Sequence, residues 1–150
     1  MKGFFALFFL SVLLLAPLNA DPQPRSERRV LSAADVERLI RTLSPFKGQK
    51  VSLAHVGADG EAAQLADQLD GIMHGAGWVQ PGPVQSGPVD SRGVAPRGNY
   101  SGIDLTVPER TRASDALWNG LLAAGLDVTA HLDPAAVPHG AISIFVYPRP

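Results

Sequence analysis

The sequence predicts an α/β domain in which a mainly parallel sheet of roughly four or five short strands carries two packed helices, with an amphipathic helix ahead of them. Strand-like and helix-like segments alternate in the order βαββαββ. Both sheet-packed helices end in Ala-Gly directly before the next strand, which is typical of a parallel crossover. The 150 residues include no Cys, so packing rather than disulfides must stabilise the domain.

The first twenty residues have the pattern of an export signal. Lys2 precedes an apolar run from Gly3 to Leu15, and the small residue Ala20 comes just before polar sequence. The alternative is an uncleaved membrane anchor, because extending the run to Asn19 gives a stretch only a little shorter than the ~20 residues that span a bilayer. Pro17 disfavours the anchor. Both interpretations place the folded part outside the cytoplasm, either periplasmic or secreted in the first case, or attached to the membrane in the second.

Residues 21–30 are polar, contain prolines and show no periodicity, so we expect a flexible tether before a single domain over residues 31–150. The domain opens with the pattern of an amphipathic helix. Ser32 and Asp35 form a capping-box pattern, and Pro45 ends the helix. Apolar residues recur between them at helical spacing: Val36, Leu39, Ile40 and Leu43.

Two strand-helix-strand units follow. In the first, a strand over Val51–Val56 leads into a helix that Gly75 and Gly77 stop, and a second strand begins at Trp78. Pro81 and Pro83 must cut this second strand or confine it to a sheet edge. In the second unit, a strand, a helix and two strands are expected over these ranges: Gly102–Val107, Ser114–Ala124, Leu126–Ala130 and Ile142–Tyr147.

The two units match at an offset of 48 residues, as in the pairs Leu69/Leu117 and Gly77/Gly125. The match indicates either a duplicated unit or convergence, because amphipathic helices of α/β proteins commonly share such residues.

Packing and turn residues occur in several further segments: Phe46–Val51, Asp59–Ala63, Ala76–Trp78, Gly102–Val107, Ala116–Leu117 with Ala123–Gly125, and Ile144–Pro150. In these segments the chain resembles an uncharacterised bacterial envelope-associated α/β domain that often follows an N-terminal membrane segment, over about residues 31 to 150. The resemblance implies a fold and no activity, so it assigns no catalytic residue. The chain departs from that pattern at Tyr147, where Gly is expected, and in a long Pro/Gly insert.

Candidate ligand-binding residues follow from the expected sheet. Ligands of open parallel sheets bind beyond the carboxyl ends of strands. His55 and Asp59 follow the first strand, Glu109 and Arg110 follow the third, and His131 follows the fourth. A His with two carboxylates can act as a general base or a loose metal site, and otherwise such residues are strand-end histidines and solvated loop charges. Because the spacing matches no ligand pattern, no catalytic residue, metal site or cofactor is assigned.

The Pro- and Gly-rich segment 80–101 is expected to be a loop that serves as a binding surface, and it contributes Tyr100 as a further candidate. Trp118 can either pack at the boundary of the core or anchor a partner. In the first sheet-packed helix, Asp70 is expected to support His74 near the helix C-terminus, although both can also chelate a cation weakly with Asp67.

Charge limits the possible partners. The chain has 13 basic and 14 acidic residues and a formal net charge of −1, and its basic cluster is confined to Arg25, Arg28 and Arg29. Nucleic acid is therefore not expected as a partner. The leading hypothesis is a non-enzymatic exported domain that binds a protein or an envelope component.

Two other functions stay open. One is a small periplasmic enzyme or metal-binding protein that uses His55, Asp59 and Glu109. The other is a structural part of a membrane-anchored envelope assembly, which contacts the membrane only if the N-terminal segment is uncleaved.

Overall fold

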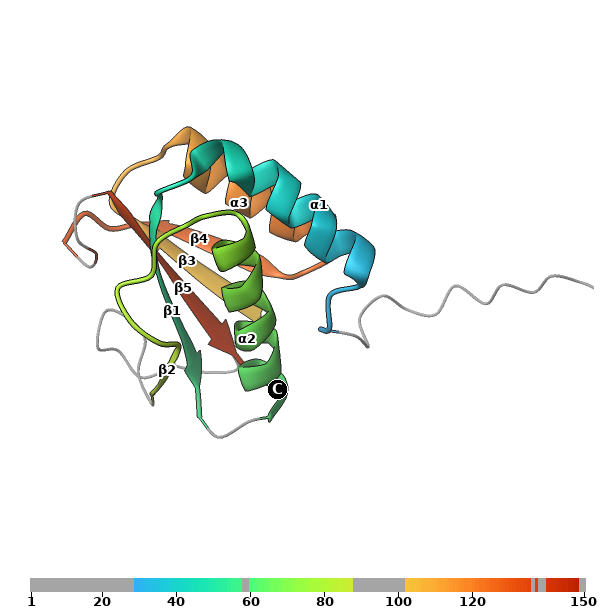
Figure 1. Ribbon diagram of the computed structural model, residues 1–150. Helices are drawn as coiled ribbons and strands as arrows, with labels where there is room; N and C mark the ends of the chain where they lie inside the picture. The colour runs from blue at the N-terminus through green and yellow to red at the C-terminus, as the bar shows by residue number, and fades with distance from the viewer. Residues whose placement is uncertain (1–28, 58–59, 88–101, 136, 138–139, 149–150) are drawn as a thin grey trace, which may run out of the picture.

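The computed structural model describes residues 29–57, 60–87, 102–135, 137 and 140–148. Figure 1 shows one twisted sheet with helices packed on it. Along the chain the elements are α1 (Ala33–Leu43), η2 (Ser44–Phe46), β1 (Lys50–Val56), α2 (Gly60–Gly75), β2 (Gln85–Gly87), β3 (Gly102–Val107), α3 (Arg112–Ala123), β4 (Val128–Leu132) and β5 (Ala141–Tyr147). Within these ranges, no helix has the length and apolar character needed to cross a membrane.

The five strands form a sheet in the order β2-β1-β5-β3-β4. β1 is parallel to both β2 and β5, and β3 is parallel to β4, whereas β3 and β5 are antiparallel. The prediction of an α/β domain with a mostly parallel sheet is therefore confirmed. Because β3 and β5 are antiparallel, the unit containing β1 and the unit containing β3 run in opposite directions.

The two helices of the strand-helix-strand units end in the same way. Gly77 and Gly125 have φ angles of 75° and 79°, which the absence of a Cβ permits. In the first unit Trp78 N–H donates to Met73 C=O at 2.9 Å, and the second unit has the equivalent bond from residue 126 to residue 121 at 3.1 Å. These are Schellman ends, so the predicted glycine stops are confirmed. Duplication of the unit stays a prediction.

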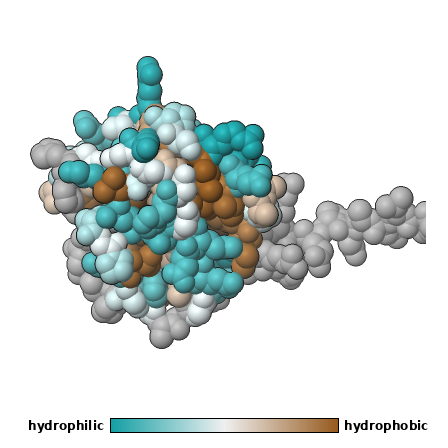
Figure 2. All heavy atoms as spheres, in the orientation of Figure 1, coloured by the Kyte–Doolittle hydropathy of each residue, from teal (hydrophilic) through white to brown (hydrophobic). Residues whose placement is uncertain are grey.

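The core lies between the helices and one face of the sheet. Side chains alternate across a strand, so the residues that face the helices come from every second position. The central strands contribute a continuous buried apolar layer: Val51, Leu53, Ile103, Leu105, Ile142, Ile144 and Val146. In Figure 2 the helical side of the molecule is mostly hydrophilic, with apolar atoms visible between the helices.

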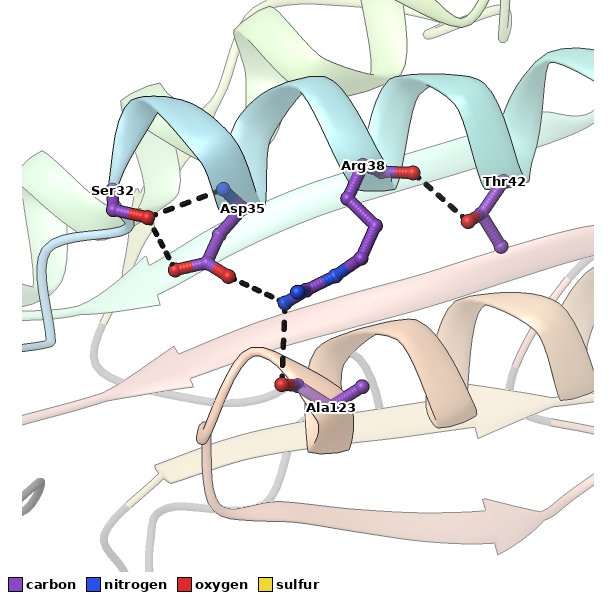
Figure 3. A network of polar contacts seen from close by, with 5 residues as sticks. All are labelled: Ser32, Asp35, Arg38, Thr42 and Ala123. Atoms are coloured by element: carbon purple, nitrogen blue, oxygen red, sulfur yellow. Dashed lines mark hydrogen bonds and ion pairs between the residues drawn. The ribbon is translucent and has the colours of Figure 1, made fainter.

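Figure 3 shows how α1 is fixed to the end of α3. Ser32 Oγ accepts from Asp35 N–H at 3.2 Å and donates to the Asp35 carboxylate at 2.6 Å. Arg38 pairs with Asp35 and donates to Ala123 C=O at 3.2 Å, while Thr42 Oγ donates to Arg38 C=O at 2.8 Å. A cation at the last carbonyls of α3 also interacts favourably with that helix dipole.

This network predicts a pH-dependent contribution to stability. The Ser32 hydroxyl, followed by Arg38, holds the pKa of Asp35 below its ordinary value of 3.8. The ionised carboxylate therefore favours the folded state, and its contribution is complete above pH 3.8 and lost as pH falls through the lowered pKa. Asp35→Asn should reduce the free energy of unfolding in urea by a few tenths of a kilocalorie per mole at pH 7. The difference should shrink as pH falls further below 3.8, and an equal loss from Glu37→Gln on the same helix would contradict the assignment.

Three elements begin two or more residues away from their predicted starts. The second strand is at residues 85–87, and Val79 makes only an isolated bridge to Lys50, because the prolines at 81 and 83 lack the N–H groups a ladder needs. α3 begins at Arg112 because Thr111 and Ser114 form a capping box. β4 is at residues 128–132, since the first two residues of the expected strand complete the turn after α3.

The start of the folded region is tied to the last strand. Arg29 is buried and donates to Tyr147 C=O. The Tyr147 ring in turn lies against Phe145, with ring centroids 5.4 Å apart. Residue 29 of the expected tether, residues 21–30, is thus held by the domain.

Candidate functional site

The sequence-predicted candidates do not meet at one edge of the sheet. His55 lies near the carboxyl end of β1, beside Val146 of β5, whereas Glu109 and Arg110 follow the carboxyl end of β3. β3 is antiparallel to β5, and Thr106 pairs with Ser143. Residues 143 and 146 are about 10 Å apart along β5. The structure therefore does not bring His55 together with Glu109 and Arg110, because β1 and β3 run in opposite directions.

Two further candidates, Asp59 and Tyr100, lie outside the described residues, as does most of the expected loop over residues 80–101. The described part of that loop includes β2. His55 is half-buried, and its Nδ1 has no hydrogen-bond partner within the described part of the chain. His55 belongs to no group of three metal-ligating side chains within the described residues.

The expected support of His74 by Asp70 is confirmed on the outside of α2. His74 Nδ1 lies 3.3 Å from Asp70 Oδ1, which also accepts from Gln80 Nε2 at 2.5 Å. Across the described ranges, no three His, Cys, Asp or Glu side chains are arranged to hold a metal ion.

His131 lies within β4 rather than after it, and it faces a partner that the sequence analysis missed. Its Nε2 is 3.4 Å from Oδ1 of Asp104 on β3. The Asp104 side chain is 8% exposed, whereas that of His131 is 40% exposed. Register places both on the sheet face away from the core, with Thr106 directly opposite His131. The charged residue inside the strand Gly102–Val107 was the available sign in the sequence.

The hydroxyl groups near this pair are poorly placed for catalysis. Thr106 and Ser143 lie on the same face but are only 3% and 4% exposed. A nucleophile must reach the reacting atom of a substrate, so these hydroxyls are not accessible as they stand. The contact between Asp104 and His131 links the neighbouring strands β3 and β4.

A pocket of about 210 Å³ lies on the other face of the same strands. Its lining comes from β3, α3, β4 and the turn before α3: Leu105, Val107, Arg110, Ser114, Asp115, Trp118, Ala130, His131 and Leu132. Arg110 Nε donates to Asp115 Oδ1 at 2.8 Å, and this exposed ion pair contributes both signs of charge to the lining. Arg110 and part of His131 line the pocket, but the His131 imidazole lies on the opposite face of the sheet with Asp104, and neither His55 nor Glu109 is among the lining residues.

The two tryptophans of the chain differ in how their indole N–H groups are satisfied. Trp78 is buried, and its Nε1–H donates to Leu43 C=O at 3.1 Å. Trp118 packs against the core and lines the pocket, but its buried Nε1–H has no acceptor among the described residues. A buried donor without an acceptor costs free energy.

This contrast predicts unequal effects of two matched substitutions. Trp78→Phe should lower the free energy of unfolding by about 1–3 kcal/mol, because it leaves the Leu43 carbonyl unsatisfied and removes core volume. Trp118→Phe should cost less than about 1 kcal/mol, because it also removes an unsatisfied donor. Urea unfolding followed by circular dichroism measures both, and a larger cost at Trp118 would show that its indole N–H has a partner.

β4 forms one outer edge of the sheet, beside this pocket. The hydrogen bonds at the ends of its ladder run from Ile103 N–H to Asp127 C=O at 2.8 Å and from Asp133 N–H to Val107 C=O at 2.9 Å. Along a parallel ladder, alternate residues direct their backbone groups to the same neighbour. The backbone groups of every second residue therefore point away from β3: those of Val128, Ala130 and Leu132. No described strand pairs with this outer side.

The side chains along the outer edge are apolar on the helix side. Ala130 and Leu132 are exposed and line the pocket, and Leu132 is 65% exposed. Leu122 at the end of α3 is also exposed. The edge thus combines outward backbone groups with exposed apolar side chains.

No protein-family model matches this chain, and comparisons with curated proteins and with solved structures found no match either. The geometry of the β4 edge and its pocket therefore carries the functional argument.

Proposed function

We propose that this chain is an exported, non-enzymatic binding domain whose ligand is an extended segment of a partner protein, added to β4 as a further strand. The observation that carries the proposal is the outer edge of β4, where outward backbone groups lie beside an apolar pocket. Extended peptides bind exposed edges in this way: main-chain hydrogen bonds give affinity, and pockets for alternate side chains give specificity.

The two edges of the sheet differ in a way that supports β4. The edge strand β2 is only three residues long and follows two prolines, which are common protections against unwanted pairing. β4 has five residues and contains no Pro or Lys. An unprotected edge favours pairing with another chain, so β4 is the edge suited to a partner.

Side-chain contacts would add to the backbone hydrogen bonds. A residue of the added strand on the helix side would lie against Leu132 and Trp118, over the pocket. Complete burial of one exposed leucine is worth about 1.5–3 kcal/mol. The apolar pocket therefore favours a segment with apolar residues at alternate positions.

Export and the nature of the partner are parts of the same proposal. If the N-terminal segment is a cleaved signal, the partner is a protein of the envelope or the extracellular space; if it is an anchor, the domain belongs to a membrane-attached assembly. The enzyme alternative needs His55 and Glu109 together, and their separation gives it no support.

The proposal is tested with an acetylated and amidated peptide of sequence Lys-Val-Thr-Val-Thr-Val-Lys as the probe. Its titration into the isotope-labelled domain should move NMR signals of β4 and of the Trp118 indole. Signals of α2 should stay unchanged. Absence of any shift at millimolar peptide, or shifts centred on β2, would overturn the proposal.

A further inference from the structure

We propose further that the added segment carries a basic residue where it passes Asp127, next to apolar residues at alternate positions. This inference rests on the proposed strand addition and names the chemistry of the partner. The basis for the basic residue is the pair of acidic residues, Asp127 and Asp133, that lie immediately before and after β4.

An acidic residue lies on each side of β4. Asp127 is exposed and comes directly before the strand; Asp133 comes directly after it and is not free, since its Oδ1 accepts from Ala135 N–H at 3.1 Å. Side chains alternate along extended chain, so both are expected on the same side as Thr129 and His131. On a neighbouring strand, the residue directly opposite each of them lies about 5 Å away.

The start of β4, next to Asp127, has an additional source of negative charge. α3 crosses back between the parallel strands β3 and β4, so its C-terminal end leads directly into Asp127. A helix C-terminus carries a partial negative charge. Arg38 binds Ala123 C=O there, but its guanidinium also pairs with Asp35. The nearby positive charge is thus already matched by a carboxylate.

The same charges argue against a second copy as the occupant. If two β4 strands paired antiparallel over their full length about Ala130, Asp127 of each would lie opposite Asp133 of the other. Like charges directly opposite one another on paired strands are destabilising. A partner segment with basic residues opposite Asp127 and Asp133 would be attracted to these carboxylates rather than repelled by them.

The expected pattern does not depend on strand direction. Positions opposite Asp127 and Asp133 are basic, and positions opposite Val128, Ala130 and Leu132 are apolar. The resulting seven-residue pattern is basic-apolar-polar-apolar-polar-apolar-basic, which is the same in both directions.

The experiment compares two capped peptides with one core, Lys-Val-Thr-Val-Thr-Val-Lys and Glu-Val-Thr-Val-Thr-Val-Glu, by NMR titration of the full folded domain. We expect the Lys peptide to bind at least tenfold more tightly at 20 mM salt. The ratio should shrink at 500 mM salt, where screening shortens the reach of charges. Asp127→Lys should reverse the preference, while Asp67→Lys on the exposed side of α2 makes the same change of net charge and should leave it intact.

The outcomes separate the two proposals. If neither peptide shifts the β4 signals, strand addition itself fails. If both peptides shift those signals with equal affinity, or if Asp127→Lys does not alter the ratio, the basic partner is wrong and strand addition stands. If the domain alone sediments as a dimer that Asp127→Lys strengthens or leaves unchanged and that the Lys peptide cannot dissociate, the occupant is a second copy and the inference is overturned.

Discussion

Gly102→Ala is expected to lower the free energy of unfolding by more than about 2 kcal/mol. Gly102 begins β3 with a φ of 103°, a conformation that L-residues rarely adopt. A Cβ at this position would also lie 2.6 Å from the backbone oxygen of Asp127. The same oxygen accepts the first ladder bond between β3 and β4, from Ile103 N–H. The substitution therefore strains the backbone and pushes apart the two strands that support the pocket.

The matched control is Gly71→Ala in α2. Apart from its chain neighbours and the surrounding helix backbone, no atom lies within 4 Å of the position of its Cβ, and its φ is not positive. In a helix, alanine is favoured over glycine by roughly 0.5–1 kcal/mol. Urea unfolding should therefore show opposite signs for the two variants. Equal stability of Gly102→Ala and the unchanged protein would mean that the β3–β4 contact is not as described.

Ala130→Pro is expected to weaken binding of the Lys peptide at least tenfold while the domain stays folded. The N–H of Ala130 points to the outer side of β4, so proline removes no bond to β3. It does remove the central donor that an added strand needs, and its ring occupies that strand's place. Binding is measured by NMR titration, with circular dichroism as the test of folding.

A second variant keeps this prediction testable if proline disturbs the strand. Leu132→Lys places a charge on the exposed edge, as natural edge strands do to prevent pairing. Val79→Lys makes the same change at another exposed apolar residue, away from β4 in the fold. Loss of binding in the first and not the second supports the β4 edge, whereas equal loss would indicate a nonspecific effect of charge.

The local structure of this domain follows from its sequence more closely than its topology does. The stops at Gly77 and Gly125 require only a residue that tolerates positive φ after an amphipathic segment. Leu69 and Leu117 are buried, as their helical spacing predicts. These features depend on neighbours a few residues apart, so local patterns contain them.

The candidate site depends on a contact that local patterns do not contain. Each crossover fixes the direction of two strands, but nothing in either unit specifies that β5 enters between β1 and β3. This insertion reverses one unit relative to the other and separates His55 from Glu109. It also leaves β4 at the sheet edge. The pair of Asp104 and His131 was missed for a related reason. The two residues are far apart in the sequence, and only the register between β3 and β4 brings their side chains close to one another.

The most direct test of the β4 edge is backbone amide hydrogen exchange, residue by residue, with and without the Lys peptide. Strand addition predicts that the outward N–H groups of Val128, Ala130 and Leu132 gain protection. The inward N–H groups of Thr129 and His131 should change little, since the β3–β4 ladder already holds them. Protection that rises equally at inward and outward positions, or that rises at β2 instead, would contradict a partner strand on β4.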